Sequence, residues 1–500
     1  MMTFIMSLTM LAGCGEHSPA ESSQNASANT VEVQSSTANS EKPSESNETS
    51  PEGKTVTIAQ SAPFSMGFGQ GVIVYENTYY ADNFYEPLVK YKDGEYTPCL
   101  ATEWSASDDG LTYTFKLREG VKFNDGTDFN AQAVKLYFDN MRPTLGASTN
   151  YGQLDTLITE ITADDDYTVS FHLSRPYYNV LNDLSMAMPR GILAPAAFNE
   201  DGSVNEEYLM DHTPGTGPYM FESVNDTATE YKFVKNPNYW GDAPDAESFT
   251  VKVIPESKVT AMRAGEVDFI IGSETLDAAS YLEFSQTDGI KGEVSDFNFV
   301  TEFIALNDEV KGLDDQNVRT AIQMAIDKAS VAENIYSGLR TPADSVMPSN
   351  MPLCKYDIKT DPLDLMTFFD KIFSQVDYEM TAYISYWFPY DPYTFVANMY
   401  PSTDYTSADG IYSTDPQVAK ALATMSDDEA KELIKGLYTY DDNEKIQEIY
   451  KKALNCANES SVVIPLNYRN EYVVYNSDKV ASYTFNSIPN HVDVAAVKLK

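Results

Sequence analysis

Apolar and polar residues follow two different spacings along the chain after residue 54. Residues 54–64, KTVTIAQSAPF, alternate β-branched and other residues as a half-buried strand does. Residues 112–126 alternate aromatic and polar residues and run into Asp125-Gly126, a strong turn signal. Residues 129–142 change to helical spacing. Because strands and helices are mixed, the pattern favours α/β lobes over a β-sandwich.

The same two spacings recur to the end of the chain, and we find no internal repeat. Acidic residues open the helical stretch that begins at Asp314, as suits a helix N-terminus. We expect strands within 164–176, 248–255, 267–273 and 461–477, and helices within 257–266, 314–338, 426–440 and 443–460.

The first 54 residues have a different character. A short apolar run ends in Leu11-Ala12-Gly13-Cys14, which has the look of a bacterial lipobox, where the cysteine is lipidated. This run is too short for a membrane-spanning helix. Residues 15–54 contain almost nothing to bury and are predicted to be a disordered tether. We therefore expect a signal peptide at 1–13, a lipid on Cys14 and an extracytoplasmic protein; an ordinary cleaved signal is the alternative.

Length and charge narrow the class of protein. Five hundred residues exceed what one core usually organises, so two or three lobes are expected. With 34 basic and 75 acidic residues, the net charge of −41 excludes a general nucleic-acid binder. It also disfavours attraction to anionic lipids, so the acyl chain should be the only membrane link.

No catalytic or metal motif is present. The chain lacks a P-loop, GxSxG and HExxH, and its acidic pairs lack the separation that a glycosidase requires and the spacing of a calcium loop. The three other cysteines have no close spacing; one disulfide with a spare thiol, or three isolated core cysteines, both stay open. We expect no enzyme and no cofactor. These cysteines are Cys99, Cys354 and Cys456.

Six strings, in order, resemble the extracellular solute-binding proteins of ABC importers, family 5, in the branch known for peptide and nickel uptake. They cover almost the whole chain after the tether, and together they are highly specific. These strings are YEPLVKY (85–91), LATEWSASDDGLTYTFKLREGVKFNDG (100–126), GTGPYMF (215–221), NPNYWG (236–241), VIPESKVTAMRAGEVDFI (253–270) and VRTAIQMAID (318–327).

The resemblance implies an α/β, two-lobed clamp of the periplasmic-binding-protein class II type, which closes on its ligand by a hinge motion. A permease and ATPase then receive the solute from a monomeric binding subunit. Crossings near Ile271-Gly272 and Tyr475 would divide the chain. The implied parts are lobe one with an extra subdomain at 55–270, lobe two at 271–474, and a return to lobe one at 475–500.

The resemblance also implies a ligand site. Arg190 lies in the apolar stretch MAMPRGILAP, where a buried arginine needs a carboxylate. In the nickel branch a similarly placed arginine grips a carboxylate of the metal's chelator; an internal salt bridge is the alternative. An aromatic loop, residues 383–395, would form a stacking wall, and Tyr151 lies near a family aromatic of the cleft. The wall would comprise Tyr386, Trp387, Tyr390 and Tyr393.

Two details bear on the ligand. Peptide-binding relatives usually carry an aspartate after the tryptophan, where this chain has Pro389; this favours a nickel or other metal chelate over an oligopeptide or dipeptide. Nickel binders often add a histidine where this chain has Thr403, and no histidine pair has ligand spacing, so we expect no metal bound directly by the protein. A sensor or adhesin on the same fold is a further alternative.

Lobe two appears shortened. After PSNMPLCKYD the family continues with a helix, a loop and a strand, but here several dozen residues are missing around Lys355 to Lys359. We expect an exposed sheet edge or apolar surface where these elements are lacking.

Overall fold

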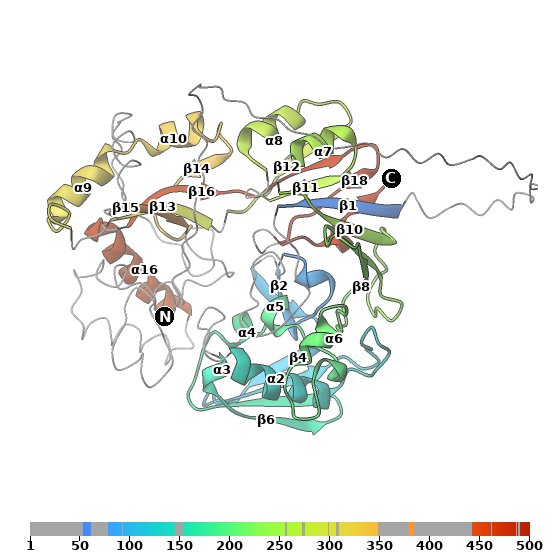
Figure 1. Ribbon diagram of the computed structural model, residues 1–500. Helices are drawn as coiled ribbons and strands as arrows, with labels where there is room; N and C mark the ends of the chain where they lie inside the picture. The colour runs from blue at the N-terminus through green and yellow to red at the C-terminus, as the bar shows by residue number, and fades with distance from the viewer. Residues whose placement is uncertain are drawn as a thin grey trace, which may run out of the picture. The chain divides into compact units, whose positions relative to one another are not determined.

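Figure 1 shows the computed structural model of the chain. It describes residues 54–500 except 62–78, 93, 146–153, 256–257, 273–275, 299, 307–309, 349–379, 385–442, 462, 487 and 489–490.

A seven-stranded sheet forms the centre of the first part of the fold, with β1 between the parallel strands β10 and β11. Alternate residues of β1 face opposite sides: Val56 and Ile58 join the largest apolar cluster, and Ala59 joins a second one with Met262 of α7 and Phe284 of α8. Both faces are therefore covered. The strand order is β12 (Ile290–Val294), β17 (Tyr472–Asn476), β11 (Phe269–Ile271), β1 (Thr55–Gln60), β10 (Ser248–Val253), β9 (Glu230–Lys235) and β8 (Tyr219–Val224).

A separate antiparallel sheet of four strands, the β5 sheet, is inserted between β1 and β8. Helix α2 packs on it through a face that includes Val134, Tyr137, Phe138 and Met141, all at most 1% exposed. The turn predicted at Asp125-Gly126 is present: Gly126 has a φ of 88°, and Lys122 and Asp128 on either side form an antiparallel bridge. The strand order is β4 (Ala101–Ala106), β5 (Thr112–Leu117), β7 (Thr168–Leu173) and β6 (Ile158–Asp165).

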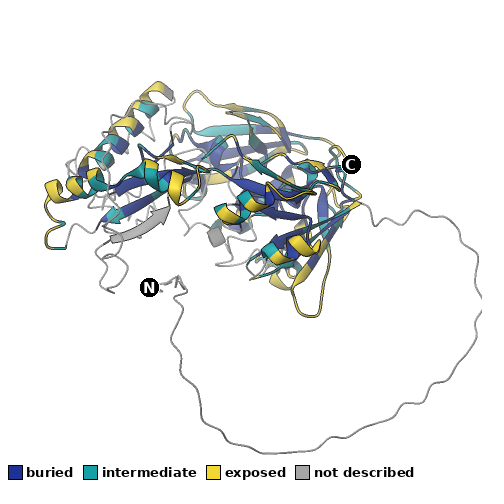
Figure 2. Ribbon diagram, turned by 90° about the horizontal axis from the view of Figure 1, so that it is seen from above, coloured by how far each residue is buried: buried dark blue, intermediate teal, exposed yellow. Residues whose placement is uncertain are grey.

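The third sheet, the β13 sheet, lies between the two halves of the seven-stranded sheet in sequence. Its strands are antiparallel neighbours, and a small apolar cluster around Ile304 and Ile464 packs against them. Figure 2 shows buried residues concentrated along the strands and exposed residues along the outer faces of the helices. The strand order is β14 (Arg340–Pro342), β16 (Val463–Arg469), β13 (Val300–Leu306) and β15 (Met380–Ile384).

The remaining strands form two short pairs, β2 (Val89–Lys92) with β3 (Glu95–Pro98), and β18 (Val480–Ser482) with β19 (Lys498–Leu499). The α-helices are α2 (Ala131–Leu145), α3 (Leu154–Leu157), α4 (Val180–Asp183), α5 (Ala187–Arg190), α6 (Glu206–Leu209), α7 (Lys258–Ala264), α8 (Ala278–Phe284), α9 (Gln316–Ala325), α10 (Lys328–Asn334) and α16 (Asn443–Ser460). Short 3-10 helices are η2 (Ala81–Asn83), η4 (Pro195–Ala197) and η5 (Val494–Ala496).

Most of the expected elements are present, with one difference. The helical stretch 314–338 is two helices, because Ile326 is extended and Asp327 starts α10 by accepting a hydrogen bond from the Ser330 N–H. The helix expected at 426–440 lies outside the described residues, as do the tether, Cys14 and the shortening around 355–359. None of the helices in the described part is long and apolar enough to cross a membrane.

The chain passes twice between the seven-stranded sheet and the β13 sheet. Strand β12 still pairs with β17 in the seven-stranded sheet, so the segment after Ile271 returns there before the chain leaves. The outward crossing therefore lies at 295–299, between β12 and β13, and the return crossing at 470–471, between β16 and β17.

A buried carboxylate, Glu86, joins three of the recognised sequence strings. Its side chain is 1% exposed and accepts hydrogen bonds from Thr216 Oγ1 at 2.9 Å and Trp240 Nε1 at 2.6 Å. Lys90 Nζ lies 3.7 Å away, and the Cys99 thiol donates at 3.9 Å. The strings around residues 215 and 236 are therefore part of the scaffold.

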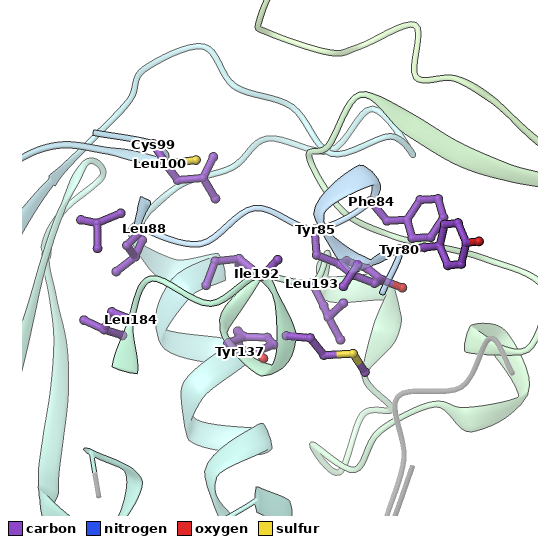
Figure 3. Packing of buried hydrophobic residues seen from close by; sticks show 14 of the residues in the cluster. Tyr80, Phe84, Tyr85, Leu88, Cys99, Leu100, Tyr137, Leu184, Ile192 and Leu193 are labelled. Atoms are coloured by element: carbon purple, nitrogen blue, oxygen red, sulfur yellow. The ribbon is translucent and has the colours of Figure 1, made fainter. Parts of the chain in front are cut away.

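The backbone around Glu86 is equally crowded. A Cβ on Gly215 would lie 2.0 Å from the Phe84 carbonyl oxygen, which is far inside van der Waals contact. Figure 3 shows Tyr85 and Leu88, which flank Glu86, in the same apolar cluster as Ile192 and Leu193. Burial raises the pKa of the Cys99 thiol to about 12, and Cys99 is a free thiol, as is Cys456. Cys354 lies outside the described residues.

Replacing Glu86 should therefore destabilise the fold. In Glu86→Ala the donors of Thr216 and Trp240 stay buried without an acceptor, so we expect a loss of about 2–4 kcal/mol in the free energy of unfolding, and a smaller loss for Glu86→Gln. Urea unfolding followed by tryptophan fluorescence measures this. Glu95→Ala, at an exposed position on β3, is the matched control, and equal midpoints for the two alanine variants would contradict the role of Glu86.

Candidate functional site

Arg190, the one expected ligand residue within the described part, lies at the end of α5 and is 1% exposed. Its Nη1 donates to both carboxylate oxygens of Asp155, at 3.0 and 2.8 Å, and its Nε donates to the Asp183 carbonyl oxygen at 3.2 Å. The internal salt bridge that the sequence left open is thus present. Burial disfavours the charged guanidinium, but Asp155 and Asp183 outweigh it and raise the pKa of Arg190.

Short helices place the three charged groups together. Asp155 is in the first turn of α3, and the N–H of its neighbour Leu154 donates to Asp183 Oδ2 at 3.1 Å, which ties α3 to α4. From α2, the Tyr137 hydroxyl donates to the Pro189 carbonyl beside Arg190. Buried apolar residues surround these groups, so the charged cluster lies inside the core. These residues include Leu154, Leu157, Val180 and Leu184.

The cluster has more negative than positive groups. The carboxyl groups of Asp155 and Asp183 both lie close to one guanidinium; Asp183 is 1% exposed, and among the described residues its Oδ1 has no hydrogen-bond partner. Burial raises the pKa of Asp183 to about 7, although Arg190 and hydrogen bonds from Leu154 and Tyr177 act in the opposite direction. Near neutral pH the cluster therefore takes up a proton that relieves the excess charge.

The other expected site residues lie outside the described residues: Tyr151, Tyr386, Trp387, Tyr390 and Tyr393. Of the segment 383–395, only Tyr383 and Ile384 are described, as the last residues of β15, which pairs antiparallel with β13.

The described histidines are engaged far from one another. His172 on β7 has Nδ1 3.2 Å from Thr112 Oγ1, His212 has Nδ1 2.6 Å from Asp211 Oδ1, and His491 has Nδ1 2.6 Å from Asp82 Oδ2. No group of three or more histidine, cysteine or acidic side chains in the described ranges is arranged to hold a metal ion.

The two crossings are hydrogen-bonded to each other. The Ser295 N–H donates to the Glu471 carbonyl at 2.7 Å, and the Glu471 N–H donates to Ser295 Oγ at 2.9 Å. The Asn470 amide donates to the carbonyls of Ser295 and Phe297 at 3.0 and 3.4 Å. Where the chain passes from one sheet to the other, the Ser295 side chain therefore takes the place of a backbone carbonyl in the hydrogen bonding between strands.

Comparison with known proteins shows to which family this chain belongs. The family model for bacterial extracellular solute-binding proteins, family 5, matches residues 95–455. The chain belongs to this family. The family 5 assignment agrees with the resemblance of the six strings.

Curated relatives are similar over part of their length. The nickel-binding periplasmic protein of Escherichia coli (strain K12) is 31% identical over 287 residues, which are 56% of this chain and 53% of that protein. The glutathione-binding protein GsiB of Pectobacterium atrosepticum is 32% identical over 287 residues, with the same shares. The chain thus spans about half the length of the curated relatives it matches.

Solved structures are similar over most of the chain. NikA from Brucella suis in complex with Fe(III)-EDTA is 26% identical with a TM-score of 0.74, over 89% of this chain and 100% of that one. DppA from Helicobacter pylori in complex with the peptide STSA is 23% identical with a TM-score of 0.68, over 89% and 98%, and shows the fold alone. The fold is therefore the mixed α/β, two-lobed fold of family 5 binding proteins.

Sequence reasoning missed Asp155 and Asp183. Each stands in a short apolar stretch that forms one turn of helix, and this is a weak signal for burial. Once Arg190 is taken as buried, an acidic residue in such a stretch is the candidate partner to look for.

Asp183 should make stability depend on pH. Its folded-state pKa of about 7 lies above the value of roughly 3.9 in an unfolded chain, so ionised Asp183 costs the folded state above pH 7 and the cost vanishes toward pH 4. We expect Asp183→Asn to be about 2–4 kcal/mol more stable than the wild type at pH 8, with the gap closing as the pH falls.

Urea unfolding between pH 4 and 8 measures the gap, and Asp108→Asn, at an exposed position, is the control with no expected pH effect. A gap for Asp183→Asn that does not vary with pH would show that Asp183 does not titrate in this range.

Proposed function

We propose that this chain is the solute-binding subunit of an ABC importer that captures nickel, or another metal ion, as a complex with a small chelator. Family 5 proteins are extracellular solute-binding proteins, and they act with the permease and ATPase subunits of an ABC importer. The likeness to NikA of Brucella suis, which was solved with Fe(III)-EDTA, is the observation that supports this ligand class. The chain delivers the complex without changing it chemically.

The sheets support a division into two lobes. Lobe one comprises the seven-stranded sheet and the β5 sheet as its extra subdomain, and lobe two the β13 sheet with α9, α10 and α16. The crossings at 295–299 and 470–471 are then the hinge, in place of the positions 271 and 475 inferred from the sequence. A ligand that contacts both lobes favours the closed state.

The proposed ligand residues are Arg190, Tyr151, Tyr386, Trp387, Tyr390 and Tyr393. Because Arg190 Nη1 donates to both oxygens of Asp155, a chelator carboxylate that binds this nitrogen would take the place of Asp155. The histidines of the described part are bonded elsewhere, which supports a metal held by chelator atoms.

A peptide is the second candidate, and it is supported by the glutathione-binding relatives and by DppA with its peptide STSA. Native mass spectrometry of freshly purified protein separates the two, because a chelate carries the isotope pattern of its metal.

Ligand binding should change the fluorescence of Trp387, which we place in the ligand wall. Titration with the nickel–histidine complex should change the emission of the wild type and leave that of Trp387→Phe unchanged, while Trp104→Phe, in the β5 sheet, keeps the response. A response to glutathione or short peptides alone would overturn the metal chelate in favour of the peptide. A wild type silent to all of these would contradict the site.

We also propose that Cys14 is lipidated and that residues 15–54 form the tether. Cys14→Ala should move the protein from the membrane fraction to the soluble fraction of a Gram-positive host, which immunoblotting of fractionated cells measures. Cys354→Ala is the control and should stay with the membrane. Release of both variants, or of neither, would contradict an anchor at Cys14.

A further inference from the structure

Two contacts, far apart in sequence, join the two lobes at different places. The first is the hinge, where Ser295, Asn470 and Glu471 bond the crossing segments to each other. Within the described ranges the chain passes between the two sheets only there. A movement of one lobe against the other must therefore bend these segments. The same movement separates any side chains of the two lobes that are in contact away from the hinge.

Helix α16 belongs to lobe two by its hydrogen bonds. At its C-terminal end the Gln316 Nε2 of α9 donates to the Glu459 carbonyl at 2.7 Å, and Arg319 Nε donates to the Ser460 carbonyl at 3.1 Å. The Asn458 amide donates to the Asp344 carbonyl at 2.8 Å, next to β14. The helix then continues directly into β16.

Tyr450 of this helix contacts lobe one. Its side chain is fully buried, and its hydroxyl is hydrogen-bonded to the hydroxyl of Tyr178. The segment around Tyr178 is fixed to the β5 sheet, because the Tyr113 hydroxyl donates to the Tyr177 carbonyl at 3.1 Å. Ile446 and Leu454, on the same face of α16, belong to the apolar cluster that contains the core of lobe one.

We propose that the Tyr178–Tyr450 pair is a latch that holds the two lobes together and sets how often the protein opens. The pair joins two side chains 272 residues apart, one carried by each lobe, away from the hinge. In the described part, the chain connects the two lobes only at the hinge. Opening at 295–299 and 470–471 would therefore move the two hydroxyls apart and break their hydrogen bond. Loss of this hydrogen bond favours the open state and removes none of the proposed ligand residues.

The test measures the distance between lobes in the full chain without any ligand. Spin labels on p-acetylphenylalanine at the exposed positions Glu103, on β4, and Glu333, on α10, report the distance by double electron–electron resonance. In Tyr178→Phe and Tyr450→Phe the ratio of open to closed molecules should rise roughly two- to tenfold, the effect of one neutral hydrogen bond. The double variant should rise no further, because the two hydroxyls form one bond.

Tyr208→Phe is the control, since Tyr208 is half-buried in lobe one and the structure gives its hydroxyl no hydrogen bond in the described part. Unfolding midpoints verify that each variant is folded. Distance distributions that superimpose on the wild type for both single variants, or effects that add in the double variant, would overturn the latch. Because no ligand is used, a failure of the proposed metal chelate does not affect this result.

Discussion

The burial of one carboxylate, that of Glu86, constrains much of lobe one. A carboxylate removed from water is costly unless nearby groups donate to it. Its donors come from three separate parts of the chain: the Thr216 hydroxyl, the Trp240 indole and the ammonium of Lys90. The turn at Gly215 can approach this segment only because it has no side chain. Three strings that look independent in the sequence are thus parts of one packing arrangement.

The cluster around Arg190 also buries charged groups, but they are less completely paired than Glu86 is. Asp155 neutralises the guanidinium, and Asp183 adds a second carboxyl group, one oxygen of which has no partner within the described part of the chain. Both carboxylate oxygens of Glu86 accept hydrogen bonds, whereas the cluster around Arg190 includes Asp183, whose pKa burial raises to about 7.

Local patterns predicted the elements well, and long-range pairing was harder. The strand at Thr55 and the helix at Asn443 follow directly from the spacing of apolar residues. The partner of Arg190 could not be read in this way, because Asp155 is 35 residues away and only the packing of α3 on α4 brings it close. Strand β12 was not predicted, because its sequence IKGEV has too few apolar residues to be recognised as a strand. The aromatic loop stays a prediction from sequence.

The position of β17 in the seven-stranded sheet has a consequence for biosynthesis. This strand lies between β11 and β12, which precede it by about two hundred residues of sequence. Until residues 472–476 leave the ribosome, both neighbours present unpaired backbone edges, so the sheet cannot be completed co-translationally from its N-terminal half. A polypeptide that must pass through a translocation channel before it folds gains time from such an arrangement, since its seven-stranded sheet is finished last.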